Sequence, residues 1–159
     1  MARWRLPRTI PAVNAPPTPC QVLLVHDRSG DPQAWVLDPT THPIALGPVV
    51  EVTEVSTVLE ALAVYAAAHF DIVVVGRPTT TTGSAADTVR RLREEAPQMV
   101  ITVIVDPLDP RAVADALHAG ATGVLSDGVS AHDAASLVQI AARGTAVVDG
   151  RAAGSLASA

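Results

Sequence analysis

The sequence contains no lysine, a single cysteine and very few aromatic residues. The absence of lysine excludes every mechanism that needs a lysine amine. A lone Cys20 excludes an internal disulfide and a zinc site built from several cysteines, so we expect an unpaired thiol. Aromatic residues make up only 3% of the chain. A core must therefore be built from Val, Leu, Ile and Ala, which suits strands covered by alanine-rich helices.

Long apolar runs are missing as well. No segment approaches the length of a membrane span, and the first twenty residues lack the apolar stretch of a signal peptide, so we expect a cytoplasmic protein that does not contact membranes. Three of the eleven arginines lie in the first eight residues, which leaves residues 21–159 with eight arginines against sixteen acids, a net charge of −8. We expect residues 21–159, with this net negative charge, to repel nucleic acid.

The 159 residues are enough for one hydrophobic core and too few for two ordinary domains. Residues 1–20 contain five prolines and no periodicity, which predicts a flexible proline-rich arm. We expect one domain over residues 21–150 and a C-terminal tail over residues 151–159.

Strand and helix patterns alternate along the domain. Short β-branched runs predict buried strands over residues 21–26, 49–55, 71–76, 100–105 and 121–126. Capping residues and glycine or proline stops predict helices over residues 56–70, 84–97, 109–120 and 130–144. Prolines between residues 27 and 48 leave only a short or broken helix there. The alternation predicts a doubly wound α/β domain, a five-stranded parallel sheet with helices on both faces.

The residues also resemble a known family. The segments "DIVVVG", "DTVRRLREEAPQMVITVIV" and "AVADALHAGATGVLSDGVS" are similar to the receiver domain of bacterial response regulators, in particular the subfamily with a C-terminal helix-turn-helix. This resemblance covers most of the chain. It implies a flavodoxin-like fold with strand order 2-1-3-4-5 and a role in two-component signal transduction or transcription regulation.

The family transfers a phosphoryl group to an aspartate at the end of the third strand. Two acids after the first strand hold Mg²⁺, a hydroxyl follows the fourth strand and a lysine follows the fifth, because metal and ammonium offset the charge of the transferring group. Carried over by position, these roles fall on His26, Asp27, Gly76, Val105 and Asp127. Only Asp27 keeps a suitable side chain, which indicates that the phosphorylation reaction has been abandoned.

In this family the site lies in a crevice at the carboxyl ends of the strands. The residues expected in this crevice allow several interpretations. Asp27, Asp106 and Asp127 could hold a divalent metal together with His26, but acids at strand ends also cap helices and solvate loops. We therefore predict no metal and no cofactor. His26 could be a pH switch or a plain hydrogen-bonding residue, and Gly76 could be a simple loss or could let a ligand approach the backbone. The threonines 79–82 could accept phosphate or form a solvated loop.

Three functions follow from these readings. The first is a pseudo-receiver without enzymatic activity, which acts as a homodimer or on a protein partner through the face formed by residues 109–120, 121–126 and 130–144. Candidate contact residues on this face are Asp115, His118, Asp133 and Arg143. The second is a small-molecule sensor whose ligand fills the vacated crevice around Gly76 and Val105. The third is an enzyme using that crevice, although no catalytic spacing supports it. We expect no direct nucleic-acid binding, and whether an output domain once followed stays open.

Overall fold

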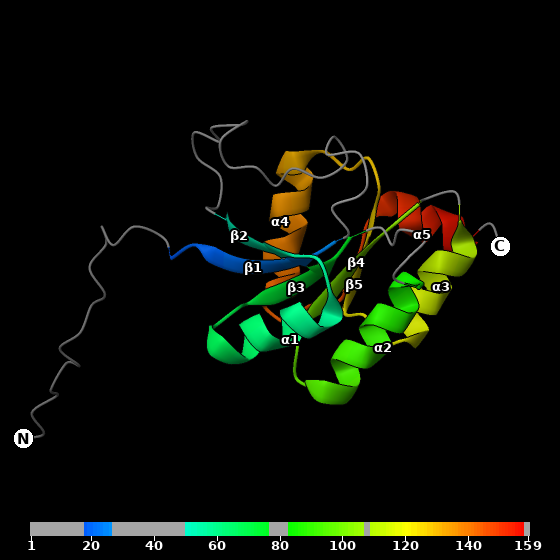
Figure 1. Cartoon of the computed structure of the whole chain (residues 1–159). Coiled ribbons are helices and arrows are strands. Elements are labelled where there is room, and N and C mark those ends of the chain that lie inside the picture. The colour runs from blue at the N-terminus through cyan, green and yellow to red at the C-terminus, as the bar shows by residue number, and fades with distance from the viewer. Residues whose placement is uncertain (1–17, 27–49, 77–82, 107–108, 158–159) are drawn as a thin grey trace, which may run out of the picture.

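The computed structural model describes residues 18–26, 50–76, 83–106 and 109–157, except for the side chains of residues 131 and 132. These residues form one parallel sheet with the strand order β2-β1-β3-β4-β5-β6 (Figure 1). The strands are β1 Cys20–Val25, β2 Val50–Val55, β3 Ile72–Val75, β4 Ile101–Val105, β5 Gly123–Ser126 and β6 Val147–Val148. The helices are α1 Val58–Ala67, α2 Ala85–Glu95, α3 Pro110–His118, α4 Ala131–Ala142 and α5 Gly150–Ala157.

Two hydrophobic clusters hold helices on the two faces of the sheet. Alternate residues of the central strands point to opposite sides, so Leu23 and Val73 belong to one cluster while Leu24 and Val74 belong to the other. The first cluster also contains buried residues of α1, α2, α3 and α5, and the second contains residues of α4. Figure 1 shows α4 on one side of the sheet and α1, α2 and α3 on the other. This confirms the doubly wound α/β class.

The predicted N-caps and glycine stops are confirmed, whereas the helix expected over residues 56–70 is shorter and spans Val58–Ala67. Ser84, Asp109 and Ser130 are N-caps, and each side chain accepts a backbone N–H of the first turn. Gly120 and Gly144 follow α3 and α4 with positive φ angles of 100° and 84°, which glycine adopts without steric cost. The helix before β3 begins after Thr57, whose hydroxyl accepts the N–H of Glu60.

The expectation of five strands is wrong, because a sixth strand pairs with the outer edge of β5. β6 has only two residues, too few for a period-two pattern to be visible in the sequence. Residues 151–157, expected to be part of a tail, belong to α5, and Ala152 of this helix is fully buried. Gly150 and Gly154 concealed the helix, because glycine is a poor helix former.

Some predictions fall outside the described residues. They concern most of the proline-rich arm, the broken helix between residues 27 and 48, the threonines 79–82 and Asp27. Cys20 is free and half-buried, and burial together with Asp71 raises the pKa of its thiol. Among the helices that the structure describes, none is long and apolar enough to cross a membrane.

Candidate functional site

All the strands run parallel, so their carboxyl ends meet at one edge of the sheet. At this edge Gly76 follows β3 and His26 follows β1, and the two strands are paired up to Val25 and Val75. The Gly76 N–H donates to the carbonyl oxygen of Val25 at 2.8 Å. The His26 N–H donates to the carbonyl oxygen of Val55 on β2 at 3.0 Å. The two predicted crevice residues therefore lie side by side, held by backbone hydrogen bonds.

Gly76 is buried, and its place leaves no room for a side chain. A Cβ atom added to Gly76 would lie 2.8 Å from the Cβ of His26, well inside van der Waals contact. The requirement for glycine does not come from backbone torsion, because Gly76 is not among the glycines with positive φ. It comes from the close approach of the first residue after β1. The space that a side chain at position 76 would need is occupied by His26.

The imidazole of His26 faces β2. Its Nε2 atom lies 3.4 Å from a carboxylate oxygen of Glu54, and both side chains are partly exposed. The resemblance implies Mg²⁺ held by two acids at positions 26 and 27, but position 26 carries an imidazole, a ligand that Mg²⁺ does not prefer. In the part of the chain that the structure describes, no three His, Cys, Asp or Glu residues lie close enough to hold a metal ion. The described residues do not fit the implied magnesium site.

The positions expected to replace the hydroxyl and the lysine lie at the ends of β4 and β5. Val105 is 4% exposed and packs in the first hydrophobic cluster, so its methyl groups belong to the core. The Asp127 N–H donates to the Val105 carbonyl oxygen at 2.7 Å, which joins the two strand ends. Asp106 is exposed, and its carbonyl oxygen accepts the N–H of Asp109 at the start of α3.

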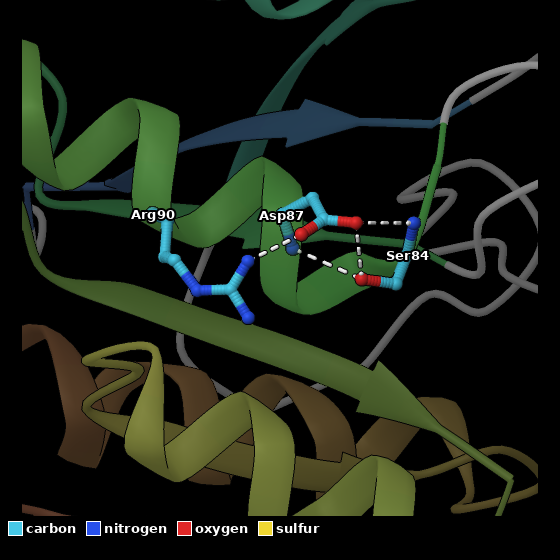
Figure 2. Close-up of polar contacts among 3 residues, drawn as sticks. All are labelled: Ser84, Asp87 and Arg90. Atoms are coloured by element: carbon cyan, nitrogen blue, oxygen red, sulfur yellow. Dashed lines mark hydrogen bonds and ion pairs between the residues drawn. The ribbon is translucent and has the colours of Figure 1, made fainter.

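The start of α2 is fixed by a compact polar group (Figure 2). The Ser84 hydroxyl donates to the Asp87 carboxylate at 2.8 Å and accepts the Asp87 N–H at 3.1 Å, and the Ser84 N–H donates to the same carboxylate. Arg90 pairs with the other carboxylate oxygen. The Ser84 hydroxyl, the Ser84 N–H and the Arg90 guanidinium lower the pKa of Asp87. This capping box explains why the helix begins at Ala85.

A second polar group at the carboxyl edge was missed by the sequence analysis. Ser126, the last residue of β5, is fully buried, and its hydroxyl donates to Asp149 at 2.7 Å. Its N–H donates to the other Asp149 carboxylate oxygen. Asp149 also accepts the N–H groups of Arg151 at 2.8 Å and Ala152 at 3.1 Å, and so caps α5. The signal in the sequence was an Asp before an alanine-rich segment, weakened by the glycines that follow it.

Asp149 is 8% exposed, so its carboxylate depends on hydrogen bonds in place of water. Burial alone would raise the pKa of this carboxyl, but the hydrogen bonds from Ser126, Ala152 and Arg151 outweigh burial and hold the pKa below its usual value. One carboxylate thus joins the end of β5 to the start of α5. Beside it lies an open groove of about 610 Å³. The groove is lined by residues of the loop after β5, of α4 and of the start of α5, among them Ser130, Leu137 and Arg151.

The four candidate contact residues are exposed but lie on two helices. Asp115 and His118 belong to α3, and Asp133 and Arg143 belong to or directly follow α4. α3 and α4 cover opposite faces of the sheet. β5 was expected to form the edge between them, but β6 extends the sheet there and α5 packs against α3 and β5.

Solved structures that are similar to this chain include response regulators. The chain is 17% identical to a LuxR-family two-component response regulator from Aurantimonas sp. SI85-9A1, covering 89% of this chain and 97% of that one, with a TM-score of 0.68. The RcsB response regulator from Salmonella typhimurium is 12% identical, with coverage of 87% and 66% and a TM-score of 0.67. A CheY-like receiver domain protein from Methanospirillum hungatei JF-1 is 17% identical, with coverage of 80% and 96% and a TM-score of 0.60.

No protein-family model and no curated protein matches this sequence. At 12 to 17% identity, the structural likeness identifies the fold and does not identify the chemistry of the site. The chain has the fold of the response-regulator receiver domain.

Proposed function

We propose that this chain is a regulatory module of the receiver fold that takes up no phosphoryl group and acts through contacts with other proteins, in bacterial signalling or transcription control. One observation carries the proposal. The position from which a phosphoaccepting side chain would project is a buried glycine, and the Cβ of His26 occupies the space that such a side chain would need. An acceptor is therefore missing, and the local packing also opposes its return.

Two further positions support the same conclusion. Val105 offers methyl groups where a hydroxyl would bind the phosphoryl group, and the absence of lysine removes the ammonium that would pair with it. The proteins of similar fold are regulatory. We extend this to the proposal that the present chain has no enzymatic activity of its own. We further propose that exposed residues on α3 and at the end of α4, including Asp115 and Arg143, contribute to its protein contacts.

Incubation with radiolabelled acetyl phosphate and Mg²⁺ tests the proposal. We expect no acyl phosphate on the protein, measured by retained label and by mass. The variant Gly76→Asp should also stay unlabelled, because Val105 and Asp127 remain unsuited to the reaction, and its melting curve reports whether it is folded. Acyl phosphate on any carboxylate of the wild-type chain would overturn the proposal. Robust labelling of the folded variant would show that Val105 and Asp127 do not block the reaction.

Small-molecule sensing is a second candidate, and a groove outside the expected crevice also supports it. Gly76 and Val105 are buried in close packing, whereas the groove beside Asp149 has a volume of about 610 Å³, in the range of ligand sites. A compound that copurifies with the protein and is detected by native mass spectrometry would favour this candidate.

A further inference from the structure

β6 and α5 together form a segment that we call the strap, residues Val147–Ala157. β6 pairs with β5, and α5 packs against α3 and β5. Figure 1 shows α5 beside α3, at the far end of the sheet from β2. The strap thus covers an edge of the sheet that would otherwise be open.

The strap satisfies backbone groups at that edge. The Val147 N–H donates to the Thr122 carbonyl oxygen at 3.3 Å, and the Asp149 N–H donates to the Val124 carbonyl oxygen at 3.2 Å. The Asp149 carboxylate accepts the N–H of Ser126. β5 itself, "GVLS", is buried and carries no charge. An uncharged strand with free backbone groups is a ready template for another strand, so the β5 edge needs a cover.

The strap is held more weakly than the other helical segments near it. β6 has two residues, and α5 contains Gly150 and Gly154, which disfavour helix by about 1 kcal/mol each relative to alanine. Ala152 is the only buried side chain of α5, whereas α4 buries the side chains of Ala134, Ala135, Val138 and Ala141. Segments with few buried contacts open first. The hydrogen bonds of the Asp149 carboxylate join the strap to β5 and add to these few buried contacts.

The connection between α4 and the strap can act as a hinge. We define the hinge as residues 143–146, all of which are exposed. Gly144 has a φ angle of 84°, and a Cβ atom added there would meet nothing within 4 Å. The sharp turn that brings the strap back onto its own β5 thus depends on one left-handed residue.

We propose that two copies of this chain exchange their straps, so that the strap of each protomer covers β5 and α3 of the other. Among the described residues, the segment that fits the surface of β5 and α3 is the strap itself. A second copy of the chain carries an identical strap, which fits the same surface equally well. Reciprocal exchange keeps every strap contact and gives a closed two-fold dimer. The inference rests on the proposed function, because it names the partner of a module that acts through protein contacts.

Substitution at the hinge tests the exchange. Gly144→Ala strains the closed monomer, because alanine disfavours a left-handed φ, and opening of the hinge relieves this strain. We expect the dimer fraction, measured by light scattering over a concentration series, to rise, and the association constant derived from it to increase on the order of five-fold per hinge. The control is Gly83→Ala, which places alanine at a φ of 80° outside the hinge. It should lower the melting temperature without raising the dimer fraction.

Amide hydrogen exchange shows whether the strap stays bound in the dimer. Residues 147–157 should be as protected in the dimer as in the monomer, because the same contacts are kept. Equal dimer fractions for both glycine variants, no dimer at any concentration, or a dimer with an unprotected strap would each overturn the proposal. If Gly144→Ala fails to fold, insertion of Gly-Ser between Thr145 and Ala146 should lower the dimer fraction of the full chain, since a longer hinge closes more easily. These measurements use no phosphodonor, so their failure is distinct from failure of the phosphorylation test.

Discussion

The Cβ of His26 limits what the end of β3 can carry. In the receiver fold this position lies at the centre of the carboxyl edge, where the strand could present a side chain to solvent and to a partner. Here the backbone of Gly76 is hydrogen-bonded to Val25, and His26 lies over the place of the missing Cβ. A residue without a side chain is therefore a packing requirement of this chain.

This contact predicts a specific coupling between positions 26 and 76. Gly76→Ala should lower the free energy of unfolding by about 1–3 kcal/mol, because a methyl group is forced against the Cβ of His26. In a His26→Gly background the same substitution should cost much less. The four free energies of a double-mutant cycle, measured by urea denaturation, give the coupling. An equal cost in both backgrounds would show that the close approach does not exist in solution.

Asp149 predicts a dependence of stability on pH. Its folded pKa is lowered, so its contribution is fully present above the unfolded pKa, near 3.9, and is lost as the pH falls through the lower folded pKa. Asp149→Asn should cost about 1–3 kcal/mol at pH 7, because the buried N–H of Ser126 loses an acceptor. The difference between variant and wild type should shrink as the pH falls below about 4.

The control for this measurement is Asp115→Asn, which changes an exposed carboxylate on α3. Its free energy of unfolding should stay within about 0.5 kcal/mol of the wild type at neutral pH. A cost for Asp149→Asn that persists unchanged into strong acid would mean that its ionised form does not hold the strap.

Among the elements, helices with complete caps could be predicted to within a few residues. Ser84 with Asp87, Asp109 with Pro110, and Ser130 with Asp133 are local signals, and each acts within one helical turn. α5 could not be predicted in this way. Its cap, Asp149, is followed by glycine, and its docking depends on Ser126, which lies 23 residues earlier in the chain. Sequence patterns within one helix or strand cannot indicate a hydrogen bond between residues so far apart in the chain.

α5 also offers a test of how weakly the strap is held. Gly154→Ala should strengthen this helix by about 1 kcal/mol, because alanine is the better helix former and nothing lies within 4 Å of the added methyl group. Amide exchange of residues 150–157 should slow accordingly. A variant that exchanges as fast as the wild type would show that helix propensity does not limit opening of the strap.

For the molecule as a whole, alternation of strands and helices predicted the parallel sheet with helices on both faces, and the resemblance to receiver domains supplied the sheet order from β2 to β5. Buried runs such as Ile72–Val75 are almost entirely apolar, and such strands are stable only with helices on both faces. The site was only half predictable. Sequence position placed His26 and Gly76 at one edge, but the distance between their backbones, which explains the glycine, depends on three-dimensional packing.

The close approach of β1 and β3 also bears on how this chain can evolve. A carboxylate that arose at position 76 alone would meet the Cβ of His26 and lower stability. A smaller residue at position 26 would remove this cost. The close approach of the two strand ends thus ties what position 76 can accept to the residue at position 26.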